Sequence, residues 1–286
     1  MLRRFTIPLA IATIFAFPAM GGLIGNDFFS GQIFDINPIT GAASGLRGSG
    51  ATFLAGVVFG SGGTLYGLTM SLSSVPNSLV TINQGTGVST LVGATGLGAI
   101  REGDIAFDPS TGALYGMQDQ PLNSLNLFRI DPLTGVATTI GPLGTVVGPP
   151  VDFSAMAFNA AGTLFIIDTS ADVLLTVDKS TAAILTTTSL SVNLGGLAGM
   201  AFDPVTGIAY VADGGPGTNS LYTLNTSNGV LSLVGAMGAP NGAAGLSFTP
   251  SAIPEPSTIG LVLFGFVVLA VRSTVGLRQR KQSRVV

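Results

Sequence analysis

Aspartate is the residue type with the most regular placement in this sequence, and its carboxylates are the groups best suited to chemistry. Asp27, Asp119, Asp168 and Asp213 each end a short apolar run and stand just before a loop. Carboxylates gathered at one end of several strands could supply part of the roughly six to eight oxygens that Ca²⁺ requires. The alternative is that each carboxylate accepts backbone N–H groups and so caps the loop that follows it. We favour capping, because carboxylates spread around a wide ring do not converge on one ion and no D-x-D-x-D-G calcium loop occurs.

A fifth candidate is Asp104, which stands where the other repeats have a small residue. The equivalent positions are occupied by Gly56, Ala155, Gly199 and Gly245. A carboxylate directed into a channel lined by small residues would be a candidate cation or ligand site. The more ordinary interpretation is an ion pair of Arg101 with Asp104 or with Glu102 on a solvent-exposed loop.

Several classes of chemistry are excluded by residues that the sequence lacks. It has no cysteine, no histidine and no tryptophan. Disulfides, thiolate nucleophiles, zinc sites built on Cys or His, and catalytic triads based on histidine are therefore ruled out. We expect a protein that is not an enzyme and has no resident cofactor, with Ca²⁺ as the one ion that the aspartates suggest. A metal-dependent hydrolase that uses these aspartates is the alternative.

Charge is scarce and unevenly distributed. Charged residues make up 9% of the chain, against about 25% in ordinary globular domains. Residues 22–251 hold thirteen acidic and four basic residues, a difference of −9, and the other seven basic residues lie in the two terminal segments. A domain with so few cations cannot neutralise phosphates, so nucleic acid is not an expected partner.

A repeat supplies the elements that must position these residues. Apolar runs begin at residues 33, 79, 127, 174 and 221, which are 46, 48, 47 and 47 residues apart. Four short strands fit into each period, joined by turns such as residues 108–112 and 131–135, in which proline fixes φ and glycine supplies a positive φ. Four antiparallel strands in about 45 residues are typical of a β-propeller blade. A β-sandwich needs no such repeat, and a β-helix coil is shorter.

The two ends of the repeat region complete each other. The fifth period supplies residues 221–224, 230–234 and 245–248 but has no second strand after the last of these, whereas residues 23–27 form an unmatched strand at the start. We therefore predict an all-β propeller of about five four-stranded blades over residues 22–251, closed by N- and C-terminal strands in one blade. Phenylalanines that recur at one repeat position should pack between blades: Phe59, Phe107, Phe158, Phe202 and Phe248.

The N-terminus has the features of an export signal. Arg3 and Arg4 precede an apolar core at residues 7–17, and Ala19-Met20-Gly21 fits the pattern of small residues at a cleavage site. Residues 1–21 are thus expected to be a signal peptide, removed by signal peptidase. The alternative is a retained N-terminal membrane anchor, which is less favoured because so short an apolar run spans a bilayer poorly.

The C-terminal segment, residues 252–286, has three parts in a fixed order. Pro254-Glu255-Pro256 comes first, then an apolar run at residues 259–271, and then a basic tail with Arg272, Arg278, Arg280 and Lys281. Extended to residues 258–277, the apolar stretch reaches the length of about 20 residues that a transmembrane helix needs. The basic tail predicts a cytoplasmic C-terminus.

This order of parts resembles the bacterial PEP-CTERM sorting signal. The resemblance covers only the tail, where Pro254, Glu255 and Pro256 match the motif that carries recognition. It implies processing by a membrane-embedded exosortase and transfer from the inner membrane to the cell surface or the extracellular matrix. Exopolysaccharide or other surface components are the partners that this location implies.

We thus expect an exported, surface- or matrix-located propeller that acts as a binding or structural module without catalysis. Besides the hydrolase, a plain membrane-anchored surface protein is the alternative.

Overall fold

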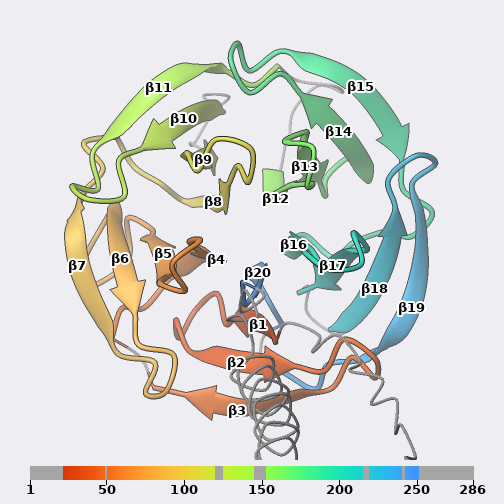
Figure 1. Ribbon diagram of the computed structural model, residues 1–286, viewed down its shortest axis with the longest axis horizontal. Helices are drawn as coiled ribbons and strands as arrows, with labels where there is room; N and C mark the ends of the chain where they lie inside the picture. The colour runs from red at the N-terminus through yellow and green to blue at the C-terminus, as the bar shows by residue number, and fades with distance from the viewer. Residues whose placement is uncertain are drawn as a thin grey trace, which may run out of the picture. The chain divides into compact units, whose positions relative to one another are not determined.

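The fold of the chain is a closed ring of five β-sheets (Figure 1). The computed structural model describes residues 22–48, 50–119, 125–144, 153–214, 219–239 and 242–250, except for the side chains of Asp119 and Phe153. Each sheet has four antiparallel strands, as the four strands placed in each sequence period predict. The expected all-β, five-bladed propeller is confirmed. In the part of the chain that the structure describes, no helix is long and apolar enough to cross a membrane.

The strands follow one order in every blade, from the axis outward. The closing blade consists of β20 (Gly245–Phe248), β1 (Leu23–Asn26), β2 (Ile33–Ile36) and β3 (Ala43–Arg47). The next two are β4 (Leu54–Phe59), β5 (Leu65–Thr69), β6 (Ser78–Ile82) and β7 (Ser89–Ala94), and then β8 (Glu102–Phe107), β9 (Leu114–Asp119), β10 (Asn126–Ile130) and β11 (Ala137–Pro142). The last two are β12 (Phe153–Phe158), β13 (Leu164–Asp168), β14 (Val173–Val177) and β15 (Ile184–Ser189), and then β16 (Ala198–Phe202), β17 (Ala209–Asp213), β18 (Ser220–Asn225) and β19 (Val230–Ala236).

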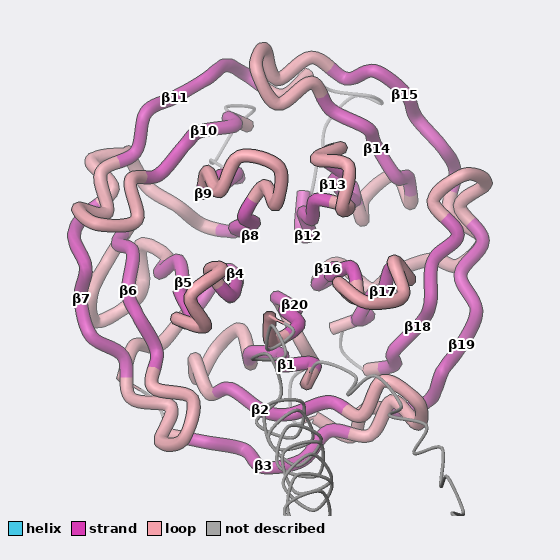
Figure 2. The backbone as a smooth tube through the Cα atoms, viewed as in Figure 1, coloured by secondary structure: helices cyan, strands magenta, loops and turns pink. Residues whose placement is uncertain are grey.

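The ring is closed by strands from the two ends of this domain. β20 pairs antiparallel with β1, with Phe248 opposite Leu23 and Gly245 opposite Asn26. The innermost strands β20, β4, β8, β12 and β16 lie around the axis in that order, and each contacts the next (Figure 2). Closure by one N-terminal and one C-terminal strand is therefore as the unmatched strands of the sequence predict.

Tight turns on one face of the ring are capped by their own side chains. Asp203 accepts hydrogen bonds from the backbone N–H of Val205 at 2.8 Å and the hydroxyl of Thr206 at 2.7 Å. Asp131 and Asn37 make the same kind of contact in two other blades. These turns fold locally because an Asx side chain replaces a backbone acceptor. We call this side of the ring the turn face, and the opposite side the loop face.

Aromatic rings hold neighbouring blades together. Each of four contacts joins a ring on a second strand to a phenylalanine on the innermost strand of the next blade, with centroids 5.2–5.6 Å apart: Tyr66–Phe107, Tyr115–Phe158, Phe165–Phe202 and Tyr210–Phe248. Separate buried apolar clusters fill the spaces between blades. The recurring phenylalanines are packing residues, as their repeat position predicts.

Candidate functional site

Asp104 lies on an innermost strand, close to the axis of the ring. Its side chain is 1% exposed, and it comes from the third residue of the innermost strand β8. One carboxylate oxygen accepts from the backbone N–H of Ile105 at 2.8 Å, and the other from that of Met156 on the neighbouring blade at 2.9 Å. The interpretation of Asp104 as a surface partner of Arg101 is therefore wrong, because spacing in sequence does not show which charged residue faces water.

The backbone of Gly56 lies against this carboxylate. A Cβ placed on Gly56 would stand 1.9 Å from Asp104 Oδ1, and one on Gly245 would stand 2.8 Å from the Cα of Gly56. Burial raises the pKa of Asp104 well above its ordinary value, against the opposing effect of the hydrogen bonds from Met156 and Ile105. The axis at this level thus holds one buried acid group packed between blades.

The aspartates at the strand ends are held by backbone groups of loops. Asp27 Oδ1 accepts from the N–H groups of Phe29 and Ser30 at 3.0 and 2.8 Å. Asp168 Oδ1 accepts from Ser170 N–H at 3.0 Å and from Ala171 N–H at 3.3 Å. Both contacts are those that the capping interpretation predicts.

Asp213 has a contact outside the loop that follows it. Its Oδ1 accepts from the N–H of Gly195, at 3.1 Å, in the connection between β15 and β16. Asp213 and Asp168 are both fully buried, on adjacent blades. The backbone of Asp119 ends β9, but its side chain lies outside the described residues. Among the side chains that the structure describes, no group of three or more acidic residues lies close enough together to hold a metal ion.

A polar cluster that the sequence analysis missed lies across two blades near Asp104. The hydroxyl of Ser154 donates to Glu102 Oε1 at 2.7 Å and is also 2.9 Å from the carbonyl oxygen of Gly196. Thr169 Oγ1 lies 3.3 Å from Ser154 Oγ. Glu102 and Ser154 are 52 residues apart, so no local pattern could have joined them.

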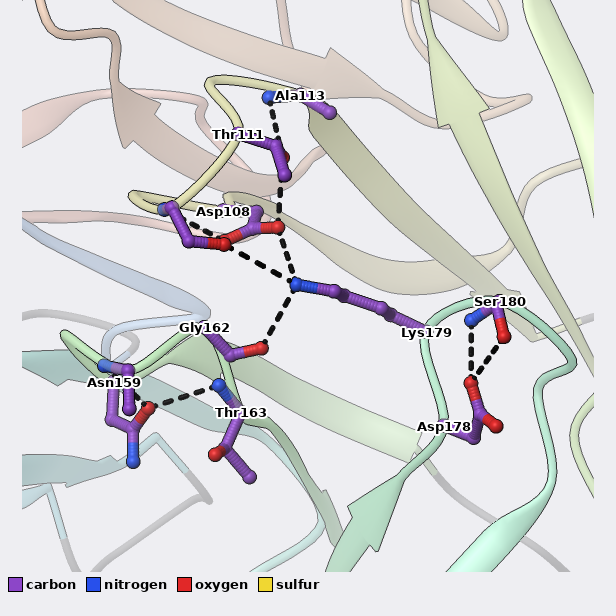
Figure 3. Close-up of polar contacts among 11 residues, drawn as sticks. Asp108, Thr111, Ala113, Asn159, Gly162, Thr163, Asp178, Lys179 and Ser180 are labelled. Atoms are coloured by element: carbon purple, nitrogen blue, oxygen red, sulfur yellow. Dashed lines mark hydrogen bonds and ion pairs between the residues drawn. The ribbon is translucent and has the colours of Figure 1, made fainter.

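A second missed feature is an ionic network on the turn face (Figure 3). Lys179 Nζ is 2.6 Å from Asp108 Oδ2 on the neighbouring blade and donates to the carbonyl of Gly162 at 3.1 Å. Burial alone would raise the pKa of Asp108, but hydrogen bonds from Lys179, Ser110 and Thr111 outweigh it and lower the pKa to about 2. The pair joins a buried Asp108 on the third blade to a Lys179 that is 30% exposed on the fourth.

We expect Lys179→Met to lower the free energy of unfolding by about 2 kcal/mol near neutral pH, because Asp108 stays buried without its cation. The folded-state pKa of Asp108, about 2, lies below its ordinary value of 3.8. Stability from the pair is therefore present above about pH 4 and is lost as pH falls through about 2. Urea unfolding of the parent, Lys179→Met, Asp108→Asn and the double variant measures the coupling. A coupling that does not shrink between about pH 5 and pH 2 would contradict this assignment.

The capped turns and the five four-stranded blades define a class of repeat domain, the five-bladed β-propeller. A family described as "Repeat of unknown function (DUF6923)" matches residues 103–252, which is just over half of the chain. The chain belongs to this family. No curated protein matches it.

Solved structures share the fold at low sequence identity. A putative gluconolactonase has 15% identity and a TM-score of 0.51, over 80% of this chain and 77% of that one. A chain of a nidogen/laminin complex has 17% identity and a TM-score of 0.49, over 76% and 78%. A protein of unknown function from Bacteroides thetaiotaomicron has 14% identity and a TM-score of 0.46; the match covers 74% of this chain but only 49% of that protein. At 15% identity, the match to the putative gluconolactonase shows the fold alone.

Proposed function

We propose that this chain is an exported propeller that acts at the cell surface or in the extracellular matrix as a binding or structural module, without catalysis. The observation that carries this proposal is that the candidate carboxylates form hydrogen bonds within the protein. Those of Asp27, Asp104 and Asp168 each accept two backbone N–H groups of the protein itself. These hydrogen bonds give the carboxylates a structural role, which is to hold loops and blades in place. Catalysis is not required to explain why aspartate occupies these positions.

The proposed location depends on the two terminal segments, which lie outside the described residues. We propose that residues 1–21 direct export and that the tail from residue 252 is processed after Pro254-Glu255-Pro256 has been recognised. Mass spectrometry of a washed cell-surface fraction tests this. A chain that begins near Gly22 and lacks the basic tail would support the proposal. The full-length tail in the membrane fraction would instead favour a plain membrane anchor.

The alternative hydrolase predicts that divalent ions bind the native protein. We expect Ca²⁺ or Mn²⁺ to leave the melting temperature of the full chain unchanged, because the candidate carboxylates already have backbone partners. The matched control is Asp168→Asn, which should not alter the response to either ion. A rise in melting temperature with the metal that is lost in this variant, together with metal-dependent ester or lactone hydrolysis, would favour the hydrolase instead.

A further inference from the structure

The fifth blade has a groove on its turn face, and none of the candidate aspartates lines it. It lies between the turn at residues 203–208 and the turn at residues 225–230, and its volume is about 390 Å³. The lining includes Phe202, Leu224 and Val230 as apolar groups, and Thr223, Asn225, Thr226, Asn228 and Ser232 as polar ones. This volume is within the range of about 300–1,000 Å³ that small-molecule sites occupy.

The repeat explains why this groove is open. In the fourth blade, the residue after the turn aspartate is Lys179, and its Nζ reaches the carbonyl of Gly162 on the inner turn at 3.1 Å. In the second blade, Gln84 has the same place after Asn83, and its amide donates to the carbonyl of Gly63 at 2.8 Å. A long side chain therefore spans the space between the two turns in both blades.

The equivalent residue of the fifth blade is Thr226, which is too short to span that space. In the fourth blade, a Cβ on Gly162 would stand 3.1 Å from Lys179 Nζ, so the lysine side chain lies close against the inner turn there. The fifth blade thus keeps open a groove that a side chain fills in two of its sister blades.

Among the described residues that line the groove, none is charged, and two of the polar side chains are held in place. Asn225 Oδ1 accepts from the N–H and the hydroxyl of Ser227, at 3.0 and 2.7 Å. Asn228 Oδ1 accepts from Val230 N–H at 3.1 Å. With both oxygens engaged, each asparagine can offer its amide N–H₂ group as a donor.

These groups select for an uncharged ligand with many hydroxyls. An ionised ligand would lose water without meeting a counter-charge, and a purely apolar one would leave the amides and hydroxyls without partners. A sugar ring satisfies both requirements, since its hydroxyls pair with amide and hydroxyl groups while its C–H faces pack on side chains such as Phe202 and Val230.

We propose that the groove of the fifth blade binds one unit of a neutral saccharide. This proposal rests on the proposed role as a binding module and names a ligand class for it. The site lies on the turn face, whereas the sequence analysis pointed to carboxylates at the ends of strands on the loop face.

The test uses the full chain in detergent and saturation-transfer NMR with glucose, galactose, mannose and N-acetylglucosamine, with glucuronate as the charged comparison. We expect at least one neutral sugar to give a signal and glucuronate to give none. Thr226→Lys should reduce the affinity about tenfold or more, because the new side chain can cross to Gly207 as Lys179 crosses to Gly162.

The matched control is Leu133→Lys, which adds the same charge to an 86% exposed position on another turn of the same face. It should bind sugar like the parent chain. Circular dichroism checks that Thr226→Lys folds. If it does not, Ser232→Tyr is the second variant, because a tyrosine on the outer strand narrows the groove and should lower the affinity in the same way.

Two results would overturn the inference: no signal from any neutral sugar, or a signal that survives in both groove variants. In the second case a sugar binds elsewhere on the propeller, so the binding-module proposal stands while the groove assignment fails. Surface location is measured separately and does not depend on either outcome.

Discussion

A chain that ends at Ala244 is expected not to fold, whereas a chain that ends at Pro250 is expected to keep its β-sheet circular dichroism and its melting temperature. The six residues that separate these two ends contain β20, the innermost strand of the closing blade. It pairs with β1 and contacts β4 and β16 on the adjacent blades. Removing it opens the ring.

Removal of β20 is expected to lower the free energy of unfolding by about as much as the whole domain has. Leu246 and Phe248 are 3% and 6% exposed, and loss of two such side chains costs about 2–5 kcal/mol each. Lost ladder hydrogen bonds add about 1 kcal/mol each, and Phe59 N–H also loses the hydroxyl of Ser247, which accepts it at 2.9 Å. The sum approaches the roughly 5–15 kcal/mol by which native domains are stable.

The shorter truncation is the matched control for the longer one. β20, the last strand in the part of the chain that the structure describes, ends at Phe248, so a chain that ends at Pro250 keeps all the strands of the five sheets. Circular dichroism and size-exclusion chromatography of both truncated chains provide the measurement. A folded chain ending at Ala244 would mean that β1 and β20 do not close the propeller.

Gly56→Ala is expected to lower the free energy of unfolding by about 3 kcal/mol or more. The new methyl group would stand 1.9 Å from Asp104 Oδ1 and 3.1 Å from the Cα of the same residue. Asp104 cannot move away freely, because both its oxygens are bound to backbone N–H groups. The collision therefore acts on the innermost strands of two blades at once.

Urea unfolding measures this effect, with Gly62→Ala as the control. Gly62 has no atom of the described residues within 4 Å of its Cβ position, so an alanine there should change the stability little. Adding Asp104→Gly to Gly56→Ala should recover part of the loss, since two other blades have glycine at this position. A Gly56→Ala chain as stable as the parent would show that the axis is looser than this packing implies.

The sequence anticipated the fold better than the site. Blade number, strand count and N-to-C closure follow from local signals, because a turn such as Asp131–Pro132 or a run such as Leu127–Phe128 folds largely by its own backbone preferences. These signals repeat at nearly constant spacing. Such a repeat indicates similar units that stack on one another, and four strands per unit are typical of propeller blades.

The candidate site was harder to predict because its contacts join different blades. Asp27 and Asp168 bind their own loops, and capping was the interpretation that local reasoning favoured. Asp104 instead contacts Met156, which is 52 residues away. Lys179 appeared in the sequence only as one of four basic residues of the domain, although it is the cation that holds Asp108.

By itself, then, the sequence determined that this protein is a closed five-bladed propeller with an excess of acidic over basic residues. The targeting role of its terminal segments stays a prediction. Only the tertiary structure decided which charged residues are buried, which loops they hold, and which groove stays open. The physical reason is that a turn or strand depends on neighbours within a few residues. The environment of Asp104, Lys179 or Thr226 depends on side chains brought close by ring closure.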